Sequence, residues 1–320
     1  MQVYMARRYG GPETLAIEDV AIPEPGEGAV LVRVHASSVN ALDWHMLRGK
    51  PYLVHATDGL RAPKEPRIGV DAAGVVEAIG PGVTDLHVGD RVFGARTGAF
   101  AEYVTGHNFV PLPAGMTFEE GAAIPVAGTT ALQAVRDKAA VRAGQRVLVT
   151  GAGGGVGTMA VQIAKALGAT VTAATSPSKA DLVRSIGADE VLDRTTDDVT
   201  RPAQPYDVII DVGSDRRLGD MRHALGPDGV LVIVGAGAGD WIGPLVRIGV
   251  GALRSRLGRQ RFLPFLSHIR RDDLFALKDL IEAGALRPVI ERTYPFAEIP
   301  EAIRRVESGQ VAGKVAISVP

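Results

Sequence analysis

The chain has 320 residues, 46% hydrophobic and 22% charged, which predicts a folded protein of two domains rather than a disordered chain. The formal net charge of −1 gives no overall electrostatic attraction to nucleic acid or acidic membranes. The absence of cysteine excludes a disulfide, a thiolate nucleophile and thiolate ligands for zinc. The N-terminal residues lack the apolar core of a signal peptide and no apolar run is long enough to span a bilayer, so we expect a cytoplasmic location.

Residues 1–123 carry short β-type runs separated by glycine and proline. Two such runs are residues 29–34, Ala-Val-Leu-Val-Arg-Val, and residues 74–80, Gly-Val-Val-Glu-Ala-Ile-Gly. Short strands with regular turn residues between them are typical of an antiparallel or barrel-like domain. We therefore predict a β-rich first domain.

From residue 124 onward, apolar strands alternate with helical stretches. The four predicted strands are residues 146–150, 170–174, 207–211 and 229–234. Strands that are apolar on both faces belong to a parallel sheet covered by helices, and residues 156–167 repeat apolar side chains at helical spacing. The pattern predicts an α/β protein whose second domain, residues 124–286, is a doubly wound, Rossmann-type unit. The tail, residues 287–320, has short strands around a helix at 299–307 and is predicted to return to the first domain.

A glycine-rich turn, Thr-Gly-Ala-Gly-Gly-Gly-Val-Gly at residues 150–157, joins the first strand of the second domain to its first helix. From Ala152 it is an A-x-G-x-x-G pattern, with alanine in place of the usual first glycine. Small residues let the backbone approach a pyrophosphate, and the helix N-terminus offers free N–H groups and a positive dipole end. The turn predicts dinucleotide binding by Gly151, Gly154, Gly155 and Val156; a purely steric glycine turn is the alternative.

The end of the second strand of this domain bears on the choice of nucleotide. NAD sites place an acidic residue there for the ribose 2′-hydroxyl, whereas this chain has Thr175, Ser176 and Lys179 and no acid. Hydroxyls and a lysine suit a 2′-phosphate, and Arg194, after the next strand, adds further donors. We expect NADP(H); the alternative is that Thr175 and Ser176 cap the following helix and Lys179 is a solvated surface charge.

Several stretches together resemble the zinc-independent medium-chain dehydrogenases/reductases, in the quinone oxidoreductase branch, over nearly the full length. They are residues 37–44 (Ser-Ser-Val-Asn-Ala-Leu-Asp-Trp), 69–76 (Gly-Val-Asp-Ala-Ala-Gly-Val-Val), 88–94 (Val-Gly-Asp-Arg-Val-Phe-Gly), 128–131 (Gly-Thr-Thr-Ala), the glycine-rich turn, 307–309 (Glu-Ser-Gly) and 313–315 (Gly-Lys-Val). The resemblance implies a GroES-like catalytic domain, a Rossmann domain inserted before its last strands, and a cofactor cleft between the two. It also implies a homodimer through the edge strand of the Rossmann sheet, near residues 261–265.

The resemblance also implies which metal ligands are missing. The first catalytic zinc ligand of the zinc alcohol dehydrogenases, a cysteine, corresponds to Asn40, and their histidine-glutamate pair corresponds to Val70 and Asp71. Valine cannot ligate a metal, so we expect no catalytic metal. Zinc would stabilise an alkoxide as a Lewis acid. Without it, the easier reaction is hydride transfer from NADPH to a quinone or an α,β-unsaturated carbonyl compound, in which the negative charge delocalises onto an oxygen.

The resemblance further assigns candidate site residues. Asn40, Tyr52 and Thr130 are the candidate catalytic residues. Tyr52 is a candidate proton or hydrogen-bond donor, with a half-buried loop aromatic as the alternative. The cofactor-binding candidates are Asn40, Thr130, Gly151, Gly154, Gly155, Val156, Thr175, Ser176, Lys179, Arg194, Val212, Gly235 and Lys314. For Asp43, a structural role at the start of a helix is weighed against a role in the site.

Three functions remain open from the sequence. The favoured one is a quinone or enone reductase; the others are an NADP-dependent alcohol dehydrogenase or carbonyl reductase, and a non-catalytic NADPH-binding sensor. The expected partner is a small-molecule substrate, with no nucleic acid. The arginine-containing segment 241–260 is interpreted as an amphipathic surface helix, with a peripheral membrane contact as the alternative.

Overall fold

The computed structural model describes residues 1–50, 55, 59–214, 216–235 and 259–320. The chain folds into two compact units. The first comprises Met1–Thr129, Ile269–Gly284 and Pro288–Pro320, and the second comprises Thr130–His268 and Ala285–Arg287. The domain boundaries predicted at 123/124 and 286/287 stay a prediction.

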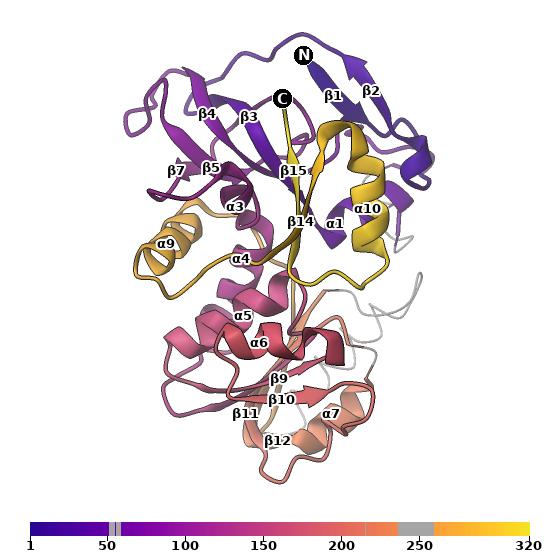
Figure 1. The fold of residues 1–320 in the computed structure, drawn as a ribbon, viewed down its shortest axis with the longest axis vertical. Coiled ribbons are helices and arrows are strands. Elements are labelled where there is room, and N and C mark those ends of the chain that lie inside the picture. The colour runs from indigo at the N-terminus through magenta and orange to yellow at the C-terminus, as the bar shows by residue number, and fades with distance from the viewer. Residues whose placement is uncertain (51–54, 56–58, 215, 236–258) are drawn as a thin grey trace. The chain divides into compact units, whose positions relative to one another are not determined.

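The first unit is built on a mainly antiparallel sheet that combines strands β3 to β7 with the C-terminal strands β14 and β15 (Figure 1). Its strand order is β14-β15-β3-β4-β5-β7, with β6 also paired to β3, and a separate pair is formed by β1 and β2. The strands are β1 (Gln2–Met5), β2 (Ala16–Asp19), β3 (Val30–Val39), β4 (Asp71–Ile79), β5 (Arg91–Ala95), β6 (Tyr103–Gly106), β7 (Phe109–Pro111), β14 (Ile290–Pro295) and β15 (Lys314–Ser318). Among the described strands of this unit, β14 and β15 are the one pair that runs in parallel.

Helices α1 (Ala41–Arg48), α3 (Phe118–Ala122), α9 (Arg271–Glu282) and α10 (Ile299–Glu307) belong to this unit. Short 3-10 turns lie at Pro12–Thr14 and Phe296–Glu298. Alternating strand residues such as Val30, Val32 and Val34 are buried in one apolar core together with Ile303 and Val315 from the C-terminal segment. The tail thus completes the core of the first unit.

The second unit is a six-stranded, all-parallel sheet in the order β10-β9-β8-β11-β12-β13. The strands are β8 (Arg146–Thr150), β9 (Thr170–Thr175), β10 (Glu190–Asp193), β11 (Tyr206–Val212), β12 (Leu225–Val234) and β13 (Arg261–Phe265). The helices are α5 (Gly155–Ala166), α6 (Ala180–Ser185) and α7 (Leu218–Ala224), with a π-helical turn at Gln133–Lys138 and a 3-10 turn at Pro177–Lys179. Helix α4 (Pro125–Leu132) runs from the first unit into the second.

The predicted α/β fold class is confirmed. The strand order of the second unit is that of a Rossmann fold, whose order reverses between β8 and β11. The predicted strand at 146–150 is β8, and the helix predicted at 299–307 is α10. Strand β13 lies at the sheet edge, as the resemblance implies, and dimerisation through it stays a prediction.

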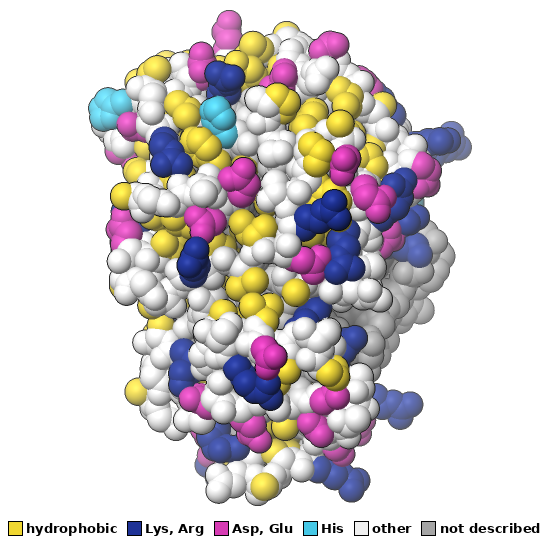
Figure 2. Space-filling model, viewed as in Figure 1, with side chains coloured by type: hydrophobic (Ala, Val, Ile, Leu, Met, Phe, Trp, Pro, Cys, Tyr) yellow, Lys and Arg dark blue, Asp and Glu magenta, His cyan; other side chains and the backbone are white. Residues whose placement is uncertain are grey.

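Surface charge does not separate by sign on the face drawn in Figure 2, where Lys and Arg side chains are interspersed with Asp and Glu. No helix in the described part of the chain has both the length and the apolar character to cross a bilayer. Most of the predicted amphipathic segment, 241–260, lies outside the described residues. Within its described end, Arg259 pairs with Asp228.

Candidate active site

The first unit contains a cluster of buried polar groups at one end of the strands β15, β3 and β4. Because β3 runs antiparallel to both neighbours, its end at Val39 lies beside the starts of β15 and β4. This topology brings together Asn40, which follows β3, Asp71, which begins β4, and Lys314, which begins β15. All three are nearly inaccessible to solvent.

The Asp71 carboxylate accepts four hydrogen bonds from described residues. Its Oδ2 accepts hydrogen bonds from Ser38 Oγ at 2.6 Å, Asn40 Nδ2 at 2.7 Å and Lys314 Nζ at 3.4 Å. Its Oδ1 accepts a hydrogen bond from the backbone N–H of Val126 at 2.9 Å. The Lys314–Asp71 ion pair is buried, with exposed side-chain fractions of 3% and 0%. A buried charge persists only when it is paired and hydrogen-bonded, and here both conditions hold.

The Asn40 amide is oriented by two opposite charges. Its Oδ1 accepts from Lys314 Nζ at 2.5 Å and its Nδ2 donates to Asp71. A flipped amide would set NH₂ against the ammonium and oxygen against the carboxylate, so the network permits one orientation. The second N–H of Nδ2 is then the donor that Asn40 has left to offer to a ligand.

Asp43 closes the first turn of α1. Its Oδ2 accepts the backbone N–H of Asn40 at 2.7 Å, while the N–H of Asp43 bonds the carbonyl oxygen of Asn40 at 3.1 Å. The carboxyl group is buried, with 3% of the residue exposed. Burial is the main cause that raises the pKa of Asp43 to about 7; the bond from Asn40 and the charge of Lys314 lower the pKa, and the charge of Asp71 raises it.

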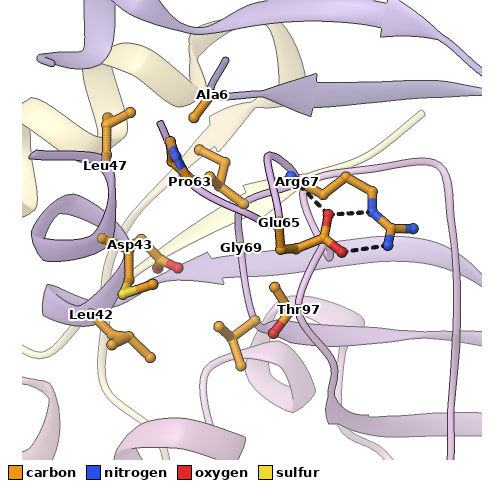
Figure 3. Close-up of a pocket in the computed structure, with 12 residues that line it drawn as sticks. Ala6, Leu42, Asp43, Leu47, Pro63, Glu65, Arg67, Gly69 and Thr97 are labelled. Atoms are coloured by element: carbon orange, nitrogen blue, oxygen red, sulfur yellow. Dashed lines mark hydrogen bonds and ion pairs between the residues drawn. The ribbon is translucent and has the colours of Figure 1, made fainter. Parts of the chain in front are cut away.

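A cavity of about 190 Å³ lies in the first unit beside this cluster. Its lining residues are Ala6, Leu42, Asp43, Met46, Leu47, Pro63, Glu65, Arg67, Ile68, Gly69, Val70 and Thr97. Most of the wall is apolar, and Figure 3 shows the Asp43 carboxyl group pointing into the space. The cavity therefore combines an apolar lining with a few polar groups, as small-molecule sites do.

A separate set of predicted residues lies at the carboxyl ends of the parallel strands in the second unit. Gly151, Ser176 and Arg194 directly follow β8, β9 and β10, while Val212 ends β11 and Gly235 follows β12. Since all five strands point the same way, the fold places these predicted residues along one sheet edge. Thr150 fixes part of this edge, because its Oγ1 donates to Asp211 at 2.8 Å and accepts the N–H of Val212 at 3.1 Å.

The glycine-rich turn leads into the N-terminus of α5, and Gly154 is its N-cap residue. Glycine has no side chain to cap the helix, so the N–H groups of the first turn are left for a ligand. Gly151 has a φ of +60°, a conformation that favours glycine. A Cβ at Gly157 would overlap the Gly151 carbonyl oxygen and Ala152 Cα, whereas a Cβ at Gly154 would lie 3.5 Å from its nearest neighbour. The turn therefore offers an open backbone surface that fits the phosphates of a dinucleotide.

The predicted 2′-phosphate residues lie together at the end of β9. Thr175 is buried, its carbonyl oxygen accepts the N–H of Arg194 at 2.9 Å, and a Cβ at Gly153 would meet both Thr175 Oγ1 and the Lys179 side chain. Ser176 precedes the 3-10 turn without a side-chain capping bond, and its Oγ lies 3.3 Å from Ser178 Oγ. Arg216, which the sequence did not single out, donates to the Arg194 carbonyl oxygen at 3.4 Å.

Two predicted residues remain, Thr130 and Tyr52. Thr130 is nearly buried at the end of α4, with its Oγ1 2.8 Å from Ser267 Oγ. Tyr52 lies outside the described residues. Ser38 and Asp71 were not predicted as partners of Asn40. The sequence feature that points to Asp71 as a candidate site residue is its position as the one acidic residue in an otherwise apolar run, residues 70–76.

Comparison with known proteins identifies the family. The model named "Alcohol dehydrogenase GroES-like domain" matches residues 26–114, and the model named "Zinc-binding dehydrogenase" matches residues 186–317. The human protein "Quinone oxidoreductase" is 33% identical over 329 residues, covering 98% of this chain and 95% of the relative. The chain belongs to the medium-chain dehydrogenase/reductase superfamily, in its quinone oxidoreductase branch.

Two further relatives of this dehydrogenase/reductase cover the whole chain. Human "NAD(P)H oxidoreductase RTN4IP1, mitochondrial" is 32% identical over 362 residues, covering 100% of this chain and 89% of the relative. The solved structure of the quinone oxidoreductase from Coxiella burnetii has a TM-score of 0.87 at 27% identity, covering 100% of this chain and 99% of that one. This medium-chain dehydrogenase/reductase is therefore an NAD(P)H-dependent oxidoreductase that acts on a small molecule.

Proposed function

We propose that this enzyme reduces quinones or α,β-unsaturated carbonyl compounds with NADPH and without a metal ion. The observation that carries the proposal is the chemistry of the Asn40–Asp71–Lys314 cluster. The resemblance aligns Asn40, Val70 and Asp71 with the zinc ligands of related alcohol dehydrogenases. Here the Asp71 carboxylate is already occupied by four donors, one of them an ammonium group, and Val70 offers no ligand atom.

The donor set therefore does not suit zinc. A metal would have to displace Lys314 and the Asn40 amide from Asp71, and cysteine thiolates, the softest zinc ligands, do not exist in the chain. Among the described residues, no group of three His, Asp or Glu side chains is arranged to hold a metal ion. The family model's name refers to zinc, and we propose that this chain works instead through hydrogen-bond donors.

A bound nicotinamide cofactor supplies a hydride to the acceptor. The protein's own contribution is to orient the acceptor and stabilise the charge that develops on its oxygen. The remaining N–H of the Asn40 amide is suited to donate to that oxygen, since Lys314 and Asp71 hold the amide in one orientation. Quinones and enones need little further charge stabilisation from the protein, because their own π systems delocalise the charge.

NADPH is the proposed cofactor form. At the end of β9, where NAD-binding relatives carry an acid, the chain presents Thr175, Ser176 and Lys179, and Arg194 is bonded to the same strand end. Arg216 adds a further cation beside Arg194. Such an arrangement of hydroxyls and cations matches the charge and acceptor oxygens of a 2′-phosphate.

The other predicted site residues keep their proposed roles. We propose that Gly151, Gly154, Gly155 and Val156 bind the pyrophosphate through backbone N–H groups. Thr130, Val212, Gly235 and Lys314 are proposed to contact or support the nicotinamide half of the cofactor, and Tyr52 stays a proposed donor to the acceptor. A homodimer and a cytoplasmic location also stay proposals.

The proposal is tested by following NADPH oxidation at the nicotinamide absorbance with 1,4-benzoquinone, 2-cyclohexenone and a simple aldehyde. NADH, a metal chelator and the reverse reaction with a simple alcohol and NADP⁺ serve as controls. We expect chelator-resistant turnover of the quinone or enone with a preference for NADPH. Chelator-sensitive alcohol oxidation would instead identify an alcohol dehydrogenase, and NADPH binding without turnover of any acceptor would favour a sensor.

A further inference from the structure

The cavity beside α1 contains three ionisable side chains among its described lining residues: Asp43, Glu65 and Arg67. Glu65 and Arg67 neutralise each other, with Arg67 Nε and Nη2 donating to the Glu65 carboxylate at 2.8 and 2.6 Å (Figure 3). These bonds lower the pKa of Glu65 below its ordinary value, so Glu65 stays ionised and can only accept hydrogen bonds near neutral pH.

Asp43 differs from Glu65 in position and in surroundings. Its carboxyl group lies on the opposite side of the cavity from the Glu65–Arg67 pair and points into the space (Figure 3). One oxygen, Oδ2, is held by the backbone N–H of Asn40, which fixes the orientation of the group. The charged groups packed around Asp43 are Asp71 from β4 and Lys314 from β15, with Glu65 and Arg67 across the cavity.

The protonation state of Asp43 suits an acid. Burial, joined by the neighbouring Asp71 charge, raises the pKa of Asp43 to about 7, so the group carries a proton for much of the time near neutral pH. Of the described cavity groups, Asp43 is thus the one able both to hold a proton and to release it at that pH. Thr97 is the other described hydroxyl or acid with an O–H at the wall, and a hydroxyl does not release its proton near neutral pH.

We propose that Asp43 is the proton donor to a small, neutral carbonyl acceptor bound in this cavity, an inference that rests on the proposed reductase function. Hydride addition at the β-carbon of an enone moves the C=C electron pair toward the carbonyl oxygen. That oxygen then forms an O–H bond as the O–H bond of Asp43 breaks, and the electron pair stays on the carboxylate. Water reprotonates Asp43, and the enol becomes the ketone in solution. Two-electron reduction of a quinone needs the same hydride and the same proton.

The cavity also predicts which acceptors bind. Pockets for drug-sized ligands measure about 300–1,000 Å³, so 190 Å³ suits a single ring or a short enone. An ionised carboxylate on the acceptor would lose its hydration in a mostly apolar lining, where the described cation, Arg67, is already paired with Glu65, and it would be repelled by any ionised Asp43. Neutral acceptors are therefore expected to be reduced in preference to anionic ones of the same size.

The test compares wild type with D43N, Y52F and E120Q. D43N keeps an oxygen to accept from the Asn40 N–H but has no acidic proton. E120Q is the matched control, because Glu120 closes the capping box of α3 by accepting the N–H of Thr117 at 3.0 Å and does not line the cavity. Turnover of 2-cyclohexenone with NADPH is measured from pH 6 to pH 9, and binding of cyclohexanone, which lacks the reducible C=C bond, is measured by calorimetry at both ends of that range.

We expect wild type and E120Q to lose about tenfold in kcat for each pH unit above 7 and to bind cyclohexanone several-fold more weakly at pH 9 than at pH 6. The kcat of D43N should be lower by about 100-fold or more, and both its kcat and its binding of cyclohexanone should be independent of pH.

Turnover and pH dependence retained in D43N, or lost in Y52F instead, would overturn the assignment of Asp43 and leave the reductase function standing. Cyclohexanone binding with the Asp43-dependent pH profile in a protein without turnover would sink the reductase function, and it would reduce the role of Asp43 from proton donor to hydrogen-bond donor for a bound carbonyl compound. If D43N does not fold, flat wild-type binding between pH 6 and pH 9 is sufficient to overturn the inference.

Discussion

Lys314 and Asn40, 274 positions apart in the chain, meet through a 2.5 Å hydrogen bond from the lysine ammonium to the amide oxygen. The bond ties the last strand of the first unit to the residue that follows β3 and fixes the orientation of the Asn40 amide. The same ammonium neutralises the buried carboxylate of Asp71. One residue near the C-terminus therefore supports both the fold and the orientation of the candidate catalytic amide.

Replacing this lysine by an uncharged side chain of similar length should be costly. K314M leaves Asp71 buried without its cation, and breaking a buried pair in this way costs about 3–5 kcal/mol of unfolding free energy. The control is K165M, since Lys165 and Asp189 form an exposed ion pair, and such a pair contributes at most about 1 kcal/mol. Urea unfolding measures both losses. Equal losses in the two variants would show that the buried pair has no special role.

Two glycines of the turn before α5 are predicted to respond differently to alanine. G157A forces a Cβ against backbone atoms of Gly151 and Ala152, which cannot move aside cheaply, so it should lower both stability and cofactor affinity. G154A meets no close neighbour in the protein and should lose at most about 1 kcal/mol of stability, the cost of alanine in place of glycine at a helix N-cap. Its methyl group would nevertheless occupy the surface proposed for the pyrophosphate. Thermal unfolding and NADPH titration separate the effects, and unchanged NADPH affinity in G154A would contradict the phosphate role of the turn.

The preference for NADPH is expected to depend on Arg194. R194A removes charge-assisted donors worth roughly 1.5–3 kcal/mol, so kcat/KM for NADPH should fall about 10- to 100-fold. NADH, which lacks the 2′-phosphate, should be used as before. R184A is the control, because Arg184 is an exposed arginine of α6 paired with Asp181. A parallel loss with both cofactors would argue against a 2′-phosphate contact.

Asp43 should make stability depend on pH. In the unfolded chain it ionises near its ordinary value of 3.8, whereas the folded chain keeps it protonated up to about pH 7. Between these values the folded state binds more protons, so the contribution of Asp43 to the free energy of unfolding falls as pH rises. The rise in pKa from 3.8 to about 7 corresponds to at most roughly 4 kcal/mol. D43N removes this dependence.

The measurement is urea unfolding of wild type and D43N at pH 4 and pH 8. The free energy of unfolding of D43N relative to that of wild type should be higher at pH 8 than at pH 4. E120Q, the capping-box control, should not reproduce this shift relative to wild type. A constant difference between wild type and D43N at both pH values would show that Asp43 titrates normally in the folded protein.

Local sequence patterns predicted the Rossmann half closely. Strand β8 matches its predicted range, and the glycine-rich turn lies between β8 and α5 as expected. In the first unit, helix α10 likewise matches its predicted range. These elements depend on short-range periodicity and on turn residues, which a single sequence displays directly. The resemblance to a known family placed Asn40 and Lys314 among the candidate site residues.

Long-range pairing was harder to predict. Nothing local to Asp71 shows that Ser38, Asn40, Val126 and Lys314 converge on its carboxylate, because that convergence follows from the order β15-β3-β4. For the same reason Asp43 was weighed mainly as a helix-start residue. Its capping bond is local, but its burial and its place at a cavity wall depend on residues 63–70 and 97, which lie far along the chain.

Hydride transfer itself is tested most directly by isotope tracing in a single turnover. Chelator-treated enzyme is mixed with one equivalent of NADPH that carries deuterium at both C4 positions and with 2-cyclohexenone. The product is then analysed by mass spectrometry and NMR. We predict one deuterium at the β-carbon of cyclohexanone and loss of the nicotinamide absorbance in equal amount. Oxidation of NADPH without deuterium in the product, or no oxidation until a metal is restored, would contradict metal-free hydride transfer to an activated carbonyl acceptor.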